Sequence, residues 1–386
     1  MNKNIIFVKN RMDGRRQHLS VRDCYMYSMQ LNIIFMKHSV LFVCIVVCLI
    51  FAGCNRRQES AKPVVLTVNK AEYENDTVEP ESLHLEQTLL RSEQSLLTAD
   101  DVTLIKELFY DQHTLEDTYP YKDTVRSFKW DEIRESLAYI ENMQADTARW
   151  VVLQNYKNQN KEAPLVRKFV RNAYRRVSDT LGVERYQSVP LYLPTDTLVP
   201  ERYGRDGTVA RLRGEEGSFC RIHPVTFDEE WLVPRRYLKR LADSTAFDHV
   251  VFVDRLNQNI ATLEHVGKGE WKIRSMNPAT TGRHAPPYAQ ETPLGMYLIQ
   301  QKKTRMVFLK DGSAETGGYA PYASRFTNGA YIHGVPVNVP RTSMIEYSWS
   351  LGTTPRSHMC VRNATSHAKF VFDWAPTERS LVVVIE

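Results

Sequence analysis

A cysteine near the C-terminus is the residue of this sequence best suited to covalent chemistry. Cys360 lies in the segment Ser-His-Met-Cys-Val-Arg-Asn, and His333 precedes it in Tyr-Ile-His-Gly. A thiol with an ordinary pKa of about 8.5 is only slightly ionised at neutral pH, and a neighbouring imidazole that accepts its proton makes it an effective nucleophile. We therefore predict that Cys360 is a nucleophile and that His333 is its general base.

Arg362 adds a positive charge two residues after Cys360. A guanidinium can hold a carboxylate through two parallel hydrogen bonds, so Arg362 either binds a substrate carboxylate or forms an ion pair that fixes the loop. The sequence contains no phosphate-binding glycine loop and no dinucleotide fingerprint. His333, His358 and His367 have no recognised metal-ligand spacing. We therefore expect neither a cofactor nor a metal.

Several short motifs precede Cys360 in a fixed order. They are Val253-Asp254 with Asn257-Gln258, Thr281-Gly282, Thr292-Pro293-Leu294-Gly295, and Tyr331-Ile332-His333-Gly334. With the Cys360 segment, this succession resembles the YkuD-type L,D-transpeptidase domain, whose pattern contains a Thr-Pro-x-Gly strand, a His-Gly strand end and a Ser-His-Gly-Cys segment. The resemblance covers residues 247–386. It implies a mostly β catalytic domain, a sandwich with one short helix.

The resemblance also implies roles for the residues around the thiol. The base is the His of His-Gly, here His333, whose second ring nitrogen is held by a backbone carbonyl, here that of Gly334. His358 shapes the site or helps to bind substrate. The backbone N–H groups of Met359 and Cys360 face the developing oxyanion, an interaction that contributes about 3 kcal/mol per donor.

Three further residues complete the predicted site. Ser357 is expected to position the oxyanion donors. Tyr322 and Arg325 precede the His-Gly strand, where the family often places substrate-groove aromatics, so we expect them to bind substrate; a place in the core is the alternative.

The implied reaction is acyl transfer on peptidoglycan. Cys360 attacks the carbonyl of the L-centred third residue of a tetrapeptide stem and expels the terminal D-Ala, and an amine of a second stem then resolves the thioester into a 3→3 cross-link. Water as acceptor would make the protein a carboxypeptidase, and a protein amine would make it an anchoring enzyme. A catalytically silent wall-binding protein is the alternative from another class. We expect stem peptides as partners and a monomer.

Two departures from the family pattern bear on activity. Met359 stands where the family has Gly, so a positive φ at this position would strain the backbone and alter the oxyanion geometry. Residues 335–356 form a longer connection than is usual between His-Gly and Ser357. This insertion is either a lid or acceptor-side wall, or a surface loop without function.

The pattern of residues 247–386 predicts the elements that position these groups. β-branched and aromatic segments predict strands. They are residues 250–254, 271–273, 295–300, 306–309, 330–333 and 381–385. Residues 363–374 can form a short helix with Ala368, Val371 and Phe372 inward.

Residues 86–183 carry apolar residues at helical spacing and predict a helical domain. Thr98 with an acidic first turn resembles a helix N-terminus. The three stripes are Val102, Ile105, Leu108 and Phe109; Trp130, Ile133, Leu137 and Ile140; and Val166, Phe169, Val170, Ala173 and Val177. The third also carries five basic residues, which either form a solvated face or contact anionic lipid or wall polymer.

Residues 184–246 change to short β segments over residues 189–193, 208–212, 218–223 and 230–233. The ending Trp-Leu-Val-Pro-Arg-Arg-Tyr-Leu resembles the close of a Src-homology-type small β-barrel. We expect a small β-barrel-like, wall-binding subdomain, or else an unspecialised β subdomain.

The N-terminal residues predict export. Residues 40–53 are small and apolar, Lys37 precedes them, and the run ends at Phe-Ala-Gly-Cys54, which resembles a lipobox. We expect residues 36–53 to be a signal peptide, Cys54 to be lipidated, residues 54–85 to be a tether and residues 1–35 to be an extension upstream of the true start at Met36. Asn55 favours anchoring in an outer membrane, facing the periplasm. An ordinary signal peptide or a membrane anchor is the alternative.

Charge and cysteine content limit the other functions. The net charge of +5 arises from residues 1–53, and residues 54–386 balance 43 basic against 43 acidic groups. A nucleic-acid binder would need a basic surface, so we expect no nucleic-acid partner. Beyond Cys54 only Cys220 and Cys360 remain, and because a nucleophile must stay free we expect no disulfide between them.

Overall fold

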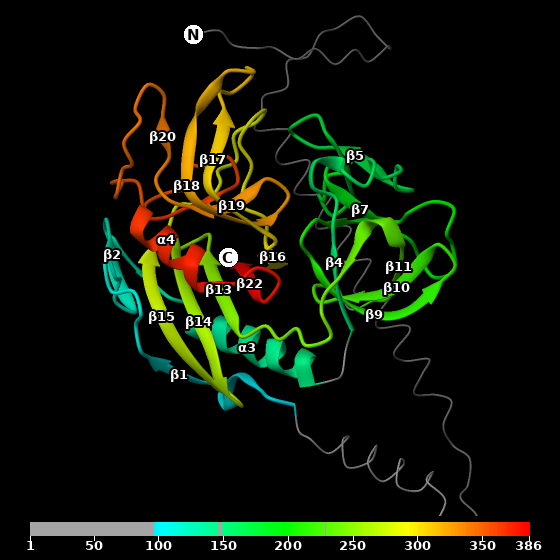
Figure 1. Cartoon of the computed structure of the whole chain (residues 1–386), viewed down its shortest axis with the longest axis horizontal. Coiled ribbons are helices and arrows are strands. Elements are labelled where there is room, and N and C mark those ends of the chain that lie inside the picture. Colours follow the sequence, from blue (N-terminus) through cyan, green and yellow to red (C-terminus); the bar gives the residue numbers. More distant parts are fainter. Residues whose placement is uncertain (1–95, 146–148, 228) are drawn as a thin grey trace, which may run out of the picture. The chain divides into compact units, whose positions relative to one another are not determined.

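The computed structural model describes residues 96–145, 149–227 and 229–386 (Figure 1). These residues belong to one compact unit, Pro80–Glu386. The predictions of a leading extension, a signal peptide, lipidation at Cys54 and a tether lie outside the described residues. In the described part, no helix is both long and apolar enough to cross a membrane.

The largest sheet has six strands in the order β1-β15-β14-β13-β22-β16. Their bounds are β1 (Thr103–Lys106), β15 (Glu270–Pro278), β14 (Asn259–Gly267), β13 (His249–Asp254), β22 (Ser380–Ile385) and β16 (Gly295–Leu298). The central strands β13 and β22 are parallel, with Val251 opposite Val382. Both are almost continuously apolar, which is typical of strands buried on both faces.

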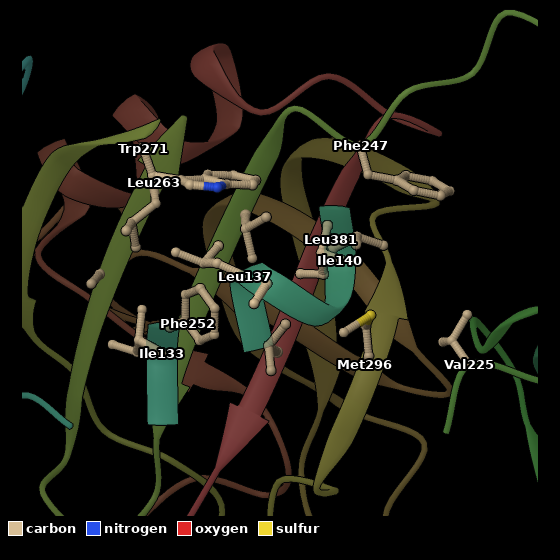
Figure 2. Packing of buried hydrophobic residues seen from close by; sticks show 14 of the residues in the cluster. Ile133, Leu137, Ile140, Val225, Phe247, Phe252, Leu263, Trp271, Met296 and Leu381 are labelled. Atoms are coloured by element: carbon tan, nitrogen blue, oxygen red, sulfur yellow. The ribbon is translucent and has the colours of Figure 1, made fainter. Parts of the chain in front are cut away.

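Side chains on β13 alternate between two hydrophobic cores. Val250 and Phe252 face the first core, where they pack with helix α3 (Trp130–Ala145). Figure 2 shows Ile133, Leu137 and Ile140 of α3 directed at this face of the sheet. The opposite face of β13 packs against a second sheet. The six-stranded sheet is therefore covered on both sides.

The second sheet carries the predicted catalytic segments. It has the order β17-β18-β19-β21, with β20 paired to β18. The bounds are β17 (Gln301–Leu309), β18 (Thr316–Thr327), β19 (Ala330–His333), β20 (Val337–Asn338) and β21 (Val361–Arg362). Helix α4 (Thr365–Trp374) contacts β18 and β19. The strands and the short helix predicted for residues 247–386 are confirmed, although Phe372 is only half-buried.

The prediction of a helical domain over residues 86–183 is wrong in the described residues, where only the stripe of α3 is an α-helix. The first stripe begins with a turn, η1 (Ala99–Asp101), in which Thr98 and Asp101 form the expected capping hydrogen bonds. The chain then continues as β1, with Leu104 opposite Trp271 of β15. Pairing with the open edge of the large sheet outweighs a weak helical propensity.

The third stripe is a β-hairpin of β5 (Phe169–Arg171) and β6 (Val177–Asp179). At its turn the Asn172 side chain accepts hydrogen bonds from the N–H groups of Tyr174 and Arg176, both at 3.0 Å. Local hydrogen bonds of this kind compete with a helix. Phe169 and Val170 are about half-exposed, so this apolar pattern does not mark a core face.

A five-stranded sheet follows, in the order β11-β10-β9-β4-β12. Its strands are β4 (Arg149–Leu153), β9 (Val209–Glu216), β10 (Phe219–Pro224), β11 (Trp231–Pro234) and β12 (Leu238–Arg240). The hairpin of β7 (Ser188–Leu191) and β8 (Arg202–Arg205) lies beside it, and the short helix η3 (Arg235–Tyr237) joins β11 to β12. The predicted β segments are confirmed. The likeness to a Src-homology-type barrel stays a prediction.

Candidate active site

Cys360 lies directly before β21, which pairs in parallel with β19. Ile332 is opposite Val361, and His333 is opposite Arg362. This register places Cys360 beside Tyr331 and brings the two predicted motifs together, although an insertion separates them along the chain. The thiol donates a hydrogen bond to the carbonyl of Gly329, at 3.6 Å.

His333 is held in one orientation at the end of β19. Its side chain is buried, and Nδ1 lies 2.6 Å from the carbonyl oxygen of Gly334. A carbonyl only accepts, so Nδ1 carries the proton and Nε2 is left as an acceptor. Burial lowers the pKa of His333 to about 4, and the charge of Arg362 contributes in the same direction. The contact predicted between His333 and Gly334 is confirmed, and the imidazole is neutral at pH 7.

Burial also keeps the Cys360 thiol in its neutral form. It raises the pKa of Cys360, against the opposing effects of the Tyr331 backbone N–H and the charge of Arg362. Across the described residues, no hydrogen bond joins the Cys360 thiol to the His333 ring. The resting pair is therefore a thiol and an imidazole, and the proton must move when the thiol attacks.

Gly334 is required by close packing next to His333. A Cβ at this position would lie 2.7 Å from the Thr365 hydroxyl oxygen and 2.9 Å from a ring carbon of Pro321. The backbone N–H of Gly334 donates to the carbonyl of Pro321 at 2.9 Å. The His-Gly pair therefore fits between β18 and the first turn of α4.

Met359 adopts a conformation that favours glycine, with φ of 150°. The strain expected for Met at this position is therefore present, and such conformations cost on the order of 1–3 kcal/mol. Surrounding backbone holds the loop in place: the Thr292 hydroxyl donates to the Met359 carbonyl at 2.8 Å. A Cβ on Gly282 would lie 2.8 Å from the Met359 Cα, so Gly282 permits this close approach.

Ser357 connects the backbone groups of Met359 and Cys360. Its hydroxyl hydrogen-bonds the Cys360 carbonyl and accepts the Met359 N–H at 3.3 Å. The Met359 N–H is thus directed at Ser357 in the resting state. Its predicted place in an oxyanion site requires that this weak contact be exchanged for the substrate oxygen.

His358 is directed at a neighbouring loop. Its Nε2 lies 3.0 Å from the carboxylate of Asp311, between β17 and β18, and its side chain is 46% exposed. Its carbonyl accepts the N–H of Gln290 at 3.3 Å. The roles predicted for His358, in shaping the site or binding substrate, stay predictions.

Arg362 brings an unpaired charge to the site. Its Nε is buried without a hydrogen-bond partner, and no carboxylate among the described residues forms an ion pair with it. Burial lowers its pKa, and the neighbouring charge of Arg283 acts in the same direction. An ion pair that fixes the loop is therefore not formed by the described residues, and the guanidinium is free to hold a substrate carboxylate.

The two other predicted substrate residues lie elsewhere on β18. Tyr322 packs edge-on against Phe372 of α4, with ring centres 5.9 Å apart. Arg325 is buried and forms an ion pair at 2.5 Å with Asp206, from the region before the catalytic domain. These contacts explain both side chains without a substrate, and their role in substrate binding stays a prediction.

The insertion, residues 335–356, is attached to the start of α4. The carbonyl of Glu346 accepts the N–H of Thr365 at 2.8 Å, and its carboxylate accepts the N–H of Ser366 at 3.0 Å. Trp349 is 74% exposed and stacks with Arg356. The structure therefore gives the insertion a fixed base and an exposed aromatic tip.

Two residues outside the predicted site, Asp206 and Tyr156, also border it. The Tyr156 hydroxyl lies 3.2 Å from that of Tyr331. The Asp-Gly pair at residues 206–207 indicates a tight turn, but nothing local in the sequence identifies what the turn contacts.

Cys220 and Cys360 are free thiols. No group of three or more His, Cys, Asp or Glu in the described part is arranged to hold a metal.

A free thiol lies directly before β21, and a neutral, oriented imidazole lies at the end of the paired strand β19, on a two-sheet β domain. This arrangement is the one predicted for a cysteine-nucleophile site. Residues 248–385 match the family model of the YkuD L,D-transpeptidase catalytic domain, and this part of the chain belongs to that family. The matched segment is the predicted catalytic domain to within one residue at each end. The family acts on the cell wall.

Matches among solved structures include an L,D-transpeptidase from Mycobacterium tuberculosis H37Rv, with 20% identity over 46% of this chain and 77% of that chain, at a TM-score of 0.29. An L,D-transpeptidase from Mycobacterium smegmatis is 16% identical over 46% of this chain and 82% of that chain, with a TM-score of 0.29. A comparison with curated proteins found no match.

Proposed function

We propose that this protein is a cysteine L,D-transpeptidase that transfers peptidoglycan tetrapeptide stems to an amine acceptor. The supporting observation is the free Cys360 thiol directly before β21, the strand that pairs with the end of β19 at His333. Nδ1 of His333 is fixed by the Gly334 carbonyl, so its Nε2 is left as a proton acceptor. The family implies stem peptides as substrates.

The proposed acylation step starts from the neutral pair. Nε2 of His333 takes the thiol proton as Sγ attacks the carbonyl carbon of the third stem residue. The oxyanion of the tetrahedral intermediate accepts the backbone N–H groups of Met359 and Cys360, with Ser357 releasing the first of them. The C–N bond to D-Ala then breaks, the leaving amine takes the proton from His333, and a thioester remains on Cys360.

Deacylation repeats these steps with a new nucleophile. An amine of a second stem attacks the thioester, His333 accepts the amine proton, and Sγ leaves and takes a proton back from His333. Arg362 holds a carboxylate of the stem, since its guanidinium has no acidic partner among the described residues. With water as acceptor the same steps describe a carboxypeptidase, and with a protein amine an anchoring enzyme.

The test is incubation of the purified chain with tetrapeptide-stem muropeptides. The expected products are free D-Ala and a dimer joined 3→3, seen by chromatography and mass spectrometry. A carbapenem supplies a second readout, because one L,D-transpeptidase of similar fold was solved in complex with imipenem. A covalent adduct on the Cys360 peptide supports the nucleophile. A silent wall-binding protein would give neither D-Ala release nor an adduct.

We also propose that the protein is exported and lipid-anchored through Cys54, facing the periplasm. The family's action on the cell wall supports export. The sequence Phe-Ala-Gly-Cys after an apolar run supports lipidation. Metabolic labelling with a clickable fatty acid should mark the wild type and not a Cys54→Ser variant, and equal labelling of both would contradict the anchor.

A further inference from the structure

Tyr156, from the region before the catalytic domain, reaches the strand beside the nucleophile. It starts the short helix η2 (Tyr156–Asn158), and its hydroxyl lies 3.2 Å from that of Tyr331. Tyr331 lies in β19, two residues before His333, and the β19–β21 register places it alongside Cys360. Tyr331 as a whole is only 3% exposed. The hydroxyl of this buried residue, which lies on the strand paired with the Cys360 segment, thus has its partner outside the catalytic domain.

A second set of contacts fixes Tyr156 in this position. Arg325 is the cross-strand partner of Tyr331 in the β18–β19 ladder, and its guanidinium lies 4.3 Å from the centre of the Tyr156 ring. The same guanidinium pairs with Asp206 at 2.5 Å, and the Asp206 carboxylate accepts the Tyr156 N–H at 3.0 Å. Tyr156, Tyr331, Arg325 and Asp206 therefore form a closed ring of contacts, two from each region.

The Asp206 carboxylate makes this ring rigid. It is fully buried and also accepts the N–H of Asn155 at 2.8 Å and the Gln300 side-chain N–H at 2.9 Å. A buried carboxylate with four donors cannot move without leaving charge uncompensated. The next residue, Gly207, has φ of 90°, and a Cβ there would lie 2.0 Å from the carbonyl oxygen of Phe326. The turn is thus in direct backbone contact with β18.

We propose that Tyr156 is a positioning residue for the nucleophile. By holding the Tyr331 hydroxyl it fixes β19, and through the β19–β21 ladder it keeps Cys360 aligned with His333. The region before the catalytic domain thereby completes the active site. Only the kinetic part of the test below rests on the proposed function.

Tyr156→Phe in the full-length chain removes the hydroxyl and keeps the ring over Arg325. Tyr237→Phe is the matched control, because Tyr237 is a buried tyrosine whose hydrogen bond, to the Lys161 carbonyl at 3.3 Å, stays within the preceding region. Tyr331→Phe removes the other hydroxyl of the pair and is the second variant. Melting curves establish that each variant is folded.

Two readouts separate positioning from general stability. The first is the rate at which iodoacetamide alkylates Cys360 across the pH range, measured by peptide mass spectrometry with buried Cys220 as reference. The second is kcat and KM for D-Ala release. Loss of one hydrogen bond should slow alkylation and lower kcat by about fivefold in Tyr156→Phe and in Tyr331→Phe. The KM of both site variants should stay within about twofold of the wild-type value. The alkylation rate and kcat of Tyr237→Phe should also stay within about twofold of the wild type.

The outcomes are distinct. Unchanged alkylation and unchanged kcat in folded Tyr156→Phe and Tyr331→Phe would overturn the proposal, and so would equal slowing by Tyr237→Phe. If the wild type releases no D-Ala while only the two site variants slow alkylation, the transpeptidase function fails and the positioning role stands. If the wild type releases D-Ala while neither site variant changes alkylation or kcat, the transpeptidase function stands and the positioning role of Tyr156 fails.

Discussion

The catalytic domain and the region before it contribute to the site in different ways. The catalytic domain supplies the thiol, the imidazole and the unpaired guanidinium from the ends of β19 and β21. The preceding region supports these groups in three places: β1 extends the large sheet, α3 covers its face, and Asp206 with Tyr156 contacts strands β18 and β19 near Cys360. The thiol, the imidazole and the guanidinium therefore all come from the catalytic domain, whereas the residues that hold them in place come from both regions of the described chain.

The largest expected effect tests whether the reactive groups lie in the catalytic domain. Cys360→Ala removes the nucleophile, so D-Ala release should fall by at least about 10³-fold. The melting temperature should stay near that of the wild type, because the thiol makes one long hydrogen bond, at 3.6 Å. Cys220→Ala is the control for loss of a thiol elsewhere. A Cys360→Ala variant as active as the wild type would refute the assignment.

The next effect tests whether the preceding region is part of the catalytic fold. Leu137 of α3 is fully buried in the core shared with β13 and β22. Leu137→Ala should lower the free energy of unfolding by about 3 kcal/mol. Denaturant unfolding, followed by tryptophan fluorescence and circular dichroism, should show a single shifted transition. Glu135→Ala, on the exposed side of α3, is the control. A separate early transition for α3 would contradict the shared core.

The pH dependence of activity tests the state of the catalytic pair. The pKa of His333 is lowered to about 4 by burial, so the neutral base persists on acidification and is lost only as the pH falls through about 4. The acid limb of kcat/KM should therefore follow a pKa near 4. The raised pKa of Cys360 predicts that alkylation of the thiol keeps rising above neutral pH. An acid limb near 6.5, the usual pKa of histidine, would show that His333 is not buried as described.

Buried histidines also link stability to pH. His333 and His367 have pKa values lowered by burial to about 4 and about 3, so between about pH 6.5 and these values the unfolded chain binds more protons than the folded one. The free energy of unfolding should then fall as the pH decreases through this window. His367→Gln should reduce the slope, measured by denaturant unfolding at several pH values.

The two regions also differ in how much of their structure local sequence determines. In the catalytic domain the apolar runs of β13 and β22 report burial on both faces, and the motif order around His333 and Cys360 identifies the site. In the region before it, β1 has a helical pattern yet pairs with β15, because pairing with a free sheet edge stabilises this segment more than its helical propensity does. Long-range contacts such as that of Asp206 with Arg325 have no local signature, since both residue types are ordinary in surface loops.

The smallest effect concerns Met359, the residue where the catalytic domain departs from its family. Its φ of 150° favours glycine, and its side chain packs against the second core. Met359→Gly relieves strain and loses packing, whereas Met359→Ala keeps the strain and loses the packing too. The Gly variant should therefore be more stable than the Ala variant by about 1 kcal/mol, the reverse of the order in ordinary strands. Denaturant unfolding of both variants measures this difference, and an Ala variant at least as stable would show that position 359 carries no strain. If the strain also displaces the N–H donors, Met359→Gly should raise kcat for D-Ala release, and an unchanged kcat would confine the effect of Met359 to stability.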